Sequence, residues 1–227
     1  MKVVALYRYP VKAMAGEPLT SVQLGWAGLE GDRRYAFVRS EDRSDFPWLT
    51  IRQVPALTTY VAKDGVVRTP AGRELAVDSQ ELAAELAAAY GRPVHLLRSS
   101  RGLFDAFPVS VISLQTVAAV SELVGRELEP LRFRPNIVID VPGAVFPEEA
   151  WIGRGLQVGD ARIRLDVRDE RCMVINFDPH TAERDPAVLR AVARHRQTCV
   201  AVYGSCVEPG EIRVGDSVTA ARSGDGA

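Results

Sequence analysis

The sequence contains little cysteine, little lysine and almost no net charge. Three cysteines among 227 residues are an odd number, which makes a poor disulfide framework and favours a reducing, cytoplasmic environment. A formal net charge of −1 argues against general nucleic-acid binding, because displacing the counterions of a phosphate backbone needs a basic excess. Lysine accounts for only three of the 28 basic residues, so the other 25 are arginine. That ratio is typical of codon bias, and we expect only particular arginines to bind phosphate or carboxylate.

Long hydrophobic runs are also missing. The longest apolar run falls far short of the roughly 20 residues that a membrane span needs. The start of the chain lacks the charged stretch and apolar region of a secretory signal. We therefore expect a cytoplasmic protein with neither a membrane segment nor a nucleic-acid partner. Hydrophobic residues nevertheless make up 47% of the chain, which is enough to bury a sizeable core in one large domain or two small ones.

Most of the chain is predicted to form short strands. β-branched and alternating runs predict strands at residues 3–9, 22–24, 35–39, 58–61, 65–68, 136–141, 156–158, 162–167, 173–177, 198–203 and 212–218. Helices are expected over 78–90, over 113–124 and from Asp185 onward, the first with a capping pair of Asp78 and Glu81. This pattern favours a mainly β, α+β protein with β-barrel architecture over a doubly wound sheet.

A polar segment broken by glycine and proline, RSSRGLFDAFP, predicts a domain boundary near its start. We therefore expect one domain over residues 1–97 and a second over 98–222. The polar residues 223–227 are expected to form a disordered tail.

Several common cofactor motifs are absent. There is no P-loop and no GxSxG elbow, and the glycines of residues 153–159 follow GxGxxxG, one residue longer than a dinucleotide-binding motif. The three histidines and three cysteines show no zinc-like spacing. Any cofactor chemistry must therefore come from a different arrangement of residues.

Three stretches place reactive side chains at the ends of predicted strands. RFRPNIVI puts Arg134 and Asn136 at the start of an apolar strand, and YPVK ends the first strand with Lys12. RCMV places Cys172 between a charged turn and another predicted strand. Nearby arginines would favour the thiolate, the form that ligates soft metals. The plain alternative is a buried, inert cysteine.

These stretches also give the chain a resemblance to a known family. YPVKAMAG, GLEGDRRYAFV, RFRPNIVID, RCMVINFDPHT and GEIRVGDSV resemble the MOSC family, the molybdenum cofactor sulfurase C-terminal domain, together with its N-terminal β-barrel domain. Relatives with this two-domain layout include the mitochondrial amidoxime-reducing component and bacterial equivalents. The resemblance implies an N-terminal β-barrel-like domain packed on a MOSC β-barrel domain.

The resemblance also implies a site for molybdenum cofactor. It implies that Cys172 is catalytic and ligates molybdenum. The residues that it implies as further cofactor ligands are Lys12, Arg34, Ser113, Thr116, Arg134 and Asn136. A helix N-terminus with exposed N–H groups and hydroxyls suits an anion, which agrees with the match at Ser113 and Thr116. The family is also associated with pyridoxal phosphate binding.

The chain departs from the family pattern at two important positions. Ala13 stands where relatives carry a serine after the lysine, and Asp169 stands where relatives often carry a first cysteine. Cys172 is then the single candidate thiol of the site. These changes leave the substrate and the identity of the bound cofactor open.

Two functions of different classes fit the sequence. The first is an oxidoreductase that reduces N-oxygenated small molecules, such as hydroxylamines or amidoximes, with electrons from a separate ferredoxin- or cytochrome-like protein. The second is a sulfur-carrier or cofactor-binding module that holds a persulfide or molybdopterin on Cys172 without redox turnover of its own. A barrel whose ancestral site has lapsed is a third reading, since fold alone does not fix function.

Overall fold

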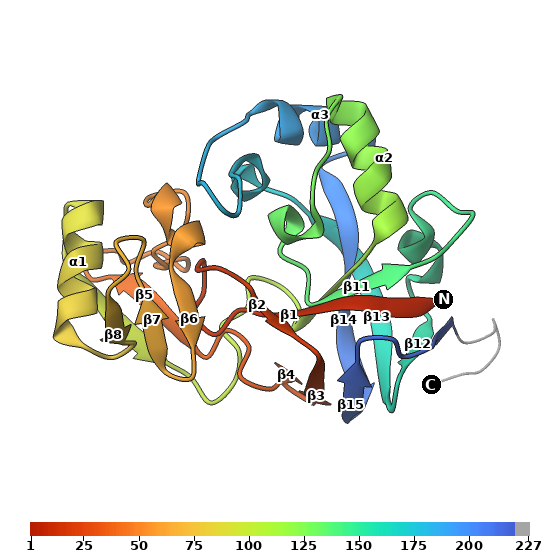
Figure 1. Ribbon diagram of the computed structural model, residues 1–227, viewed down its shortest axis with the longest axis horizontal. Coiled ribbons are helices and arrows are strands. Elements are labelled where there is room, and N and C mark those ends of the chain that lie inside the picture. The colour runs from red at the N-terminus through yellow and green to blue at the C-terminus, as the bar shows by residue number, and fades with distance from the viewer. Residues whose placement is uncertain (221–227) are drawn as a thin grey trace.

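The computed structural model describes residues 1–220, which form a large and a small lobe (Figure 1). The large lobe is built on an eight-stranded sheet. Its strands, in spatial order, are β16 (Val218–Ala220), β12 (Gly155–Val158), β13 (Ala161–Glu170), β14 (Cys199–Glu208), β10 (Val109–Ser113), β11 (Ile137–Asp140), β1 (Lys2–Arg8) and β2 (Glu17–Leu19). Only β10 and β11 run parallel, and every other neighbouring pair is antiparallel.

The large sheet is covered on both faces. A three-stranded sheet of β15 (Gly210–Arg213), β3 (Ser21–Gly25) and β4 (Gly28–Leu29) lies on one side, and helices α2 (Leu114–Val124) and α3 (Ala187–Arg196) lie on the other (Figure 1). Successive side chains of a strand point to opposite faces. In β11, Ile137 and Ile139 accordingly join the core between the two sheets, and Val138 joins the core under the helices. Double coverage explains why this strand is apolar at consecutive positions.

The small lobe holds a core of its own. Its elements are β5 (Tyr35–Arg39), 3-10 helix η1 (Pro55–Thr59), β6 (Val61–Lys63), β7 (Val66–Arg68), β8 (Glu74–Ala76), α1 (Gln80–Tyr90) and β9 (Val94–Arg98). β5 pairs with β9, and β6, β7 and β8 form a three-stranded sheet. The first strand of the chain does not belong to this lobe, because β1 lies between β2 and β11 in the large sheet.

Helix α1 begins one residue later than its predicted cap. The N-cap is Ser79, whose hydroxyl accepts the N–H of Leu82 at 3.2 Å, so the prediction of Asp78 as the cap is wrong. Leu82 and Leu86 share the buried face. Gly91 ends the helix with φ 82°, a conformation that glycine adopts without strain.

The other two helices agree with their predictions in type. Ser113 caps α2, as the predicted range of 113–124 requires. α3 starts at Ala187, two residues after Asp185, whose carboxylate accepts the N–H of Ala187 at 2.9 Å. Two further 3-10 helices, η2 (Pro130–Phe133) and η3 (Pro147–Trp151), lie in the large lobe. The prediction of a mainly β, α+β protein with a few helices is confirmed.

Some predicted strands are wrong in type or extent. Residues 173–177 form 3-10 helix η4 (Met173–Asn176), because the N–H groups of Ile175 and Phe177 bond back to carbonyls three residues earlier. η1 occupies residues 55–59, so the strand predicted at 58–61 begins only at β6. The strand predicted at 212–218 splits into β15 and β16 at a turn that contains Gly215, with φ 96°. The predicted disordered tail at 223–227 lies outside the described residues.

No helix among residues 1–220 has the length and apolar character needed to cross a membrane.

Candidate functional site

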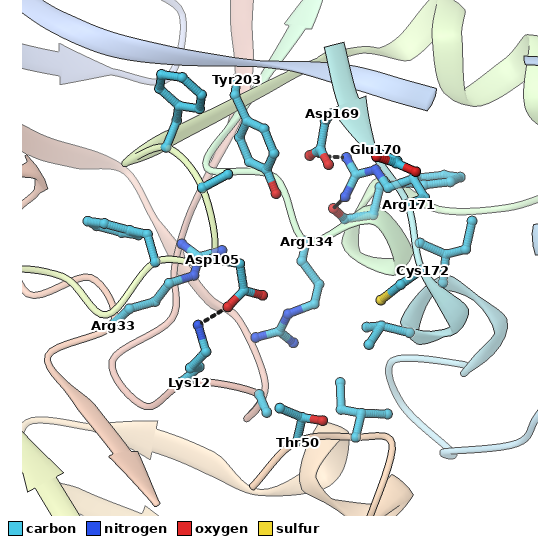
Figure 2. Close-up of a pocket in the computed structure, with 18 of the residues that line it drawn as sticks. Lys12, Arg33, Thr50, Asp105, Arg134, Asp169, Glu170, Arg171, Cys172 and Tyr203 are labelled. Atoms are coloured by element: carbon cyan, nitrogen blue, oxygen red, sulfur yellow. Dashed lines mark hydrogen bonds and ion pairs between the residues drawn. The ribbon is translucent and has the colours of Figure 1, made fainter. Parts of the chain in front are cut away.

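A cavity of about 490 Å³ lies where the two lobes meet (Figure 2). Its size falls within the range of about 300–1,000 Å³ that is typical of small-molecule sites. One wall comes from the small lobe and includes Phe46 and Thr50. Another comes from the connector between the lobes, residues 104–107, and the remainder comes from strand ends of the large lobe. The cavity therefore collects residues that are far apart in the sequence.

Cys172 lines this cavity, between the end of β13 and the start of η4. We call the part of the cavity around Cys172 its thiol end. Its sulfur points into the cavity (Figure 2). The side chain of the preceding Arg171 fixes this position, because it donates to the carbonyl of Val200 at 2.8 Å and to that of Phe133 at 2.7 Å. The backbone N–H of Arg171 also bonds to the carbonyl of Thr198 at 2.7 Å. The cysteine is thus held on an anchored backbone.

Two arginines form the cationic end of the cavity. The guanidinium carbons of Arg33 and Arg134 lie 4.7 and 4.3 Å from the ring centre of Tyr9, a buried residue whose hydroxyl donates to the carbonyl of Pro135 at 3.1 Å. Such cation–π contacts hold a guanidinium in place without neutralising its charge. Arg33 also pairs with the buried carboxylate of Asp32.

Arg134 has no such carboxylate partner within residues 1–220, where its side chain makes no ion pair and no hydrogen bond. Burial lowers the pKa of Arg134 to about 10, partly opposed by Tyr9, so the guanidinium still carries its charge at neutral pH. Its backbone has a left-handed φ of 51°. A cation held in a strained conformation at a cavity wall is typical of a binding residue.

Lys12 completes this cationic end. Its ammonium donates to the carbonyl of Leu103 at 2.7 Å and pairs with Asp105, both from the connector. It also lies 5.6 Å from the ring centre of Trp48 and 5.9 Å from that of Phe46. Burial lowers the pKa of Lys12, and the carboxylate of Asp105 opposes that change.

Asn136 lines the cavity, but its amide is engaged within the protein. The Nδ2 group donates to the carbonyl of Tyr7 at 3.2 Å and to Asp32 at 3.1 Å, and Oδ1 accepts the N–H of Ser110 at 3.1 Å. The buried carboxylate of Asp32 also accepts the N–H of Tyr9 at 2.7 Å. Asn136 and Asp32 therefore position the strand ends around the cationic residues. Asp32 is not among the residues predicted from the sequence, although its place directly before two arginines was a signal.

Three of the predicted ligands do not line the cavity. Arg34 does not line it, whereas the neighbouring Arg33 does. Ser113 and Thr116 are fully buried at the start of α2, where the Ser113 hydroxyl accepts the N–H of Thr116 and donates to its hydroxyl, both at 3.0 Å. Their hydroxyls are used in capping the helix. The structure thus brings together Lys12, Arg134, Asn136 and Cys172.

Aromatic and acidic residues outside the predicted ligand set also line the cavity. Phe104 and Phe107 come from the connector, and Phe107 stacks on Tyr203 with ring centres 6.2 Å apart. Asp169 is buried beside Arg171, with 2.6 Å between Oδ2 and Nη2. Tyr203 and the connector lie far from the motifs in sequence, so no local pattern indicated them.

A further contact ties two of the sequence motifs together outside the cavity centre. The buried Arg132 donates to Asp178 at 2.9 Å and to the carbonyl of Ile175 at 3.3 Å. Asp178 in turn accepts the N–H groups of His180 and Thr181 at 3.0 and 3.1 Å. The contacts of Arg132 hold the loop after η4 against η2.

Similarity to known proteins agrees with this geometry. Residues 1–101 match the MOSC N-terminal beta barrel domain, and residues 98–219 match the MOSC domain. Mitochondrial amidoxime-reducing component 1 of Mus musculus is 29% identical over 127 residues, which are 50% of this chain and 36% of that protein. Molybdenum cofactor sulfurase of Drosophila mojavensis is 36% identical over 85 residues, which are 37% of this chain and 10% of that protein. The chain therefore spans well under two thirds of either relative.

Among solved structures, the YuaD protein of Bacillus subtilis has the same fold with a TM-score of 0.55. The alignment covers 96% of this chain and 93% of that one at 13% identity, so it concerns the fold alone. The two adjoining domain matches show that the chain belongs to the MOSC family, with a MOSC N-terminal beta barrel domain preceding the MOSC domain.

Proposed function

We propose that this protein binds molybdenum cofactor through Cys172 and reduces N-oxygenated small molecules with electrons from a separate protein. The observation that carries the proposal is the placement of the Cys172 thiol on the walls of one cavity together with the cationic cluster of Lys12, Arg33 and Arg134. The names of both relatives support an association with molybdenum cofactor, and the name of the amidoxime-reducing component supports the reduction.

The cationic end fits the anionic part of that cofactor. Molybdopterin carries a phosphate, and arginine presents a planar fork of N–H groups that matches phosphate oxygens. Arg134 is the strongest candidate, because its buried charge has no carboxylate partner among the described residues. A phosphate beside it would offset the cost of burying that charge. Arg33 and Lys12 would add two further cations from the same side.

The thiol end fits the metal. A thiolate is a soft ligand that suits molybdenum, and Cys172 is the one cysteine that lines the cavity. When bound, the cofactor would supply the two-electron chemistry of oxygen-atom removal. The protein's own contribution is to hold the thiol on its anchored backbone and to shield the site from water with Phe104 and Phe107.

The chain's departures from the family pattern bear on this proposal. At position 13 an alanine stands beside Lys12, so the lysine acts without a neighbouring hydroxyl. At position 169 a carboxyl lines the same cavity as the single thiol. These differences affect how the cofactor and the substrate are held, whereas the cations and the thiol remain.

A sulfur-carrier or cofactor-holding module is the second candidate. It is favoured by the 36% identity to a molybdenum cofactor sulfurase, and it would use the same Cys172 to hold a persulfide or the cofactor. The two candidates differ in what the purified protein carries, which makes them separable by analysis of its contents.

The test is the metal content of protein expressed in a host that makes molybdenum cofactor. We expect stoichiometric molybdenum and a pterin fluorophore in the wild type, both lost in Cys172→Ala and retained in the control Cys206→Ala, which lies outside the cavity. The loaded protein should then reduce a hydroxylamine or an amidoxime when supplied with an artificial electron donor. Metal-free protein with cyanide-labile sulfur on Cys172 would refute the reductase and favour the carrier.

A further inference from the structure

The thiol end of the cavity contains the buried carboxyl of Asp169, which has no role in the proposed function. Asp169 is 1% exposed, lines the same cavity as Cys172 and lies three residues before it. Its Oδ2 accepts the hydroxyl of Ser110 at 3.2 Å and faces Arg171. Its Oδ1 is buried without a hydrogen-bond partner within residues 1–220. A carboxylate oxygen left in that state is costly, whereas a protonated carboxyl has a proton to donate.

The groups that face Asp169 come from every side of it. Arg171 directly follows β13, the strand that carries Asp169, and Tyr203 lies on β14. Arg33 follows β4, and Ser110 on β10 adds a hydroxyl. Figure 2 shows the hydroxyl of Tyr203 and the carboxyl of Asp169 on the same side of the cavity. Burial raises the pKa of Asp169 to about 6, although Arg171, Ser110, Tyr203 and Arg33 all act to lower it. The carboxyl therefore exchanges its proton close to neutral pH.

The reaction needs protons at this end of the cavity. Reduction of a hydroxylamine breaks the N–O bond, consumes two electrons and two protons, and releases an amine and water. The electron pair comes from the electron-donor protein of the proposed function. The departing oxygen must gain hydrogen to leave as water, and general acids work best when their pKa lies near the working pH.

We propose, on the basis of that function, that Asp169 is the proton donor of this cavity and delivers one of the two protons to the departing oxygen. The O–H bond of Asp169 breaks as the new O–H bond of the product water forms, which leaves Asp169 as a carboxylate. The second proton and the reprotonation of Asp169 come from water at the cavity mouth. Arg171 and Ser110 position the carboxyl. The hydroxyl of Tyr203 stabilises the carboxylate that remains after the proton has left.

The first test does not depend on activity. An NMR titration of aspartate side-chain carboxyl carbons, assigned by comparison with Asp169→Asn, should show one buried carboxyl that titrates about two units above an ordinary aspartate. In Tyr203→Phe this transition should move to higher pH, because the lost hydroxyl stabilised the carboxylate. A carboxyl that stays ionised down to about pH 4 would overturn the inference whatever the cofactor content.

The second test uses the molybdenum-loaded protein. We expect Asp169→Asn to keep its molybdenum but to lose on the order of 10²–10⁴-fold in kcat, and to lose the fall in rate that the wild type shows as pH rises through the carboxyl transition. Tyr203→Phe should keep that fall but show it at higher pH. The matched control is Asp160→Asn, an exposed carboxyl in the turn before β13, which should leave both quantities unchanged.

The outcomes separate the two proposals. Molybdenum-loaded Asp169→Asn with the wild-type rate and pH profile overturns the proton donor and leaves the proposed function standing. Wild-type protein that never acquires molybdenum overturns the proposed function, and the proton-donor role falls with it.

Discussion

Removing the side chain of Asp32, which supports Arg33 and Asn136 of the cavity wall from behind, should be costly. Its side chain is fully buried and holds three groups in place: the N–H of Tyr9 at 2.7 Å, the amide of Asn136 at 3.1 Å and the guanidinium of Arg33. In Asp32→Ala, Arg33 keeps a mostly buried charge without its counterion. Breaking a buried pair in this way costs about 3–5 kcal/mol.

The backbone contact adds to that cost. The N–H of Tyr9 would lose its acceptor in the interior, which is worth about 1–3 kcal/mol by itself, but the two losses share one site and do not add fully. We therefore expect Asp32→Ala to lower the free energy of unfolding by at least about 3 kcal/mol. Asp32→Asn should cost less than the alanine variant, because its carbonyl oxygen can still accept from Tyr9.

Urea denaturation followed by circular dichroism measures these differences. The control is Asp45→Ala, an exposed carboxylate of the small lobe, which should stay within about 0.5 kcal/mol of the wild type. A loss below about 1 kcal/mol for Asp32→Ala, with an unchanged denaturant slope, would refute the reasoning, since it would mean that water or another group satisfies Arg33 and Tyr9 equally well.

Three further predictions concern other parts of the molecule. Leu86→Ala empties a fully buried position of α1 and should lower the free energy of unfolding by about 2–5 kcal/mol in urea denaturation; a loss below about 1 kcal/mol would mean that the small-lobe core closes over the gap. The raised pKa of Asp169 means that the wild type loses stability as pH rises from the ordinary value of 3.8 to about 6. Asp169→Asn lacks this loss, so its stability relative to the wild type should improve by roughly 3 kcal/mol between about pH 4 and about pH 7, and a constant difference would contradict this. Arg132→Ala should speed hydrogen exchange at the amides that Asp178 accepts, because the carboxylate loses its anchor, whereas the exposed Arg154→Ala should not.

The fold could be predicted from the sequence where local pattern and tertiary packing agree. The apolar run at residues 137–139 is a strand because both of its faces are covered, and Ser113 followed by an apolar period marks the start of α2. The prediction failed after Cys172, where the apolar run of residues 173–177 reads as a strand. There the side chain of Arg171 donates to the carbonyls of Val200 and Phe133, which are distant in sequence, and η4 follows directly. Local propensity does not encode such contacts.

The site could be predicted in part for the same reason. Lys12, Arg134 and Cys172 follow or precede strands, so their places beside one cavity depend on strand ends that the sequence marks. The choice between Arg33 and Arg34 depends on the left-handed φ of 48° at Arg33, which directs that side chain toward Tyr9. Two adjacent arginines give no sequence signal for that difference.

The position of β1 in the middle of the large lobe has a consequence for dissecting the molecule. Because β1 separates β2 from β11, a fragment that starts at residue 98 would carry the MOSC domain match without the strand that covers β11. Its open strand edge would invite self-association. The missing piece, residues 1–97, would supply that strand and part of the cavity wall, including Lys12 and Arg33. The two pieces, expressed as separate polypeptides, should therefore reassemble on mixing, and the restored cavity would report on their association.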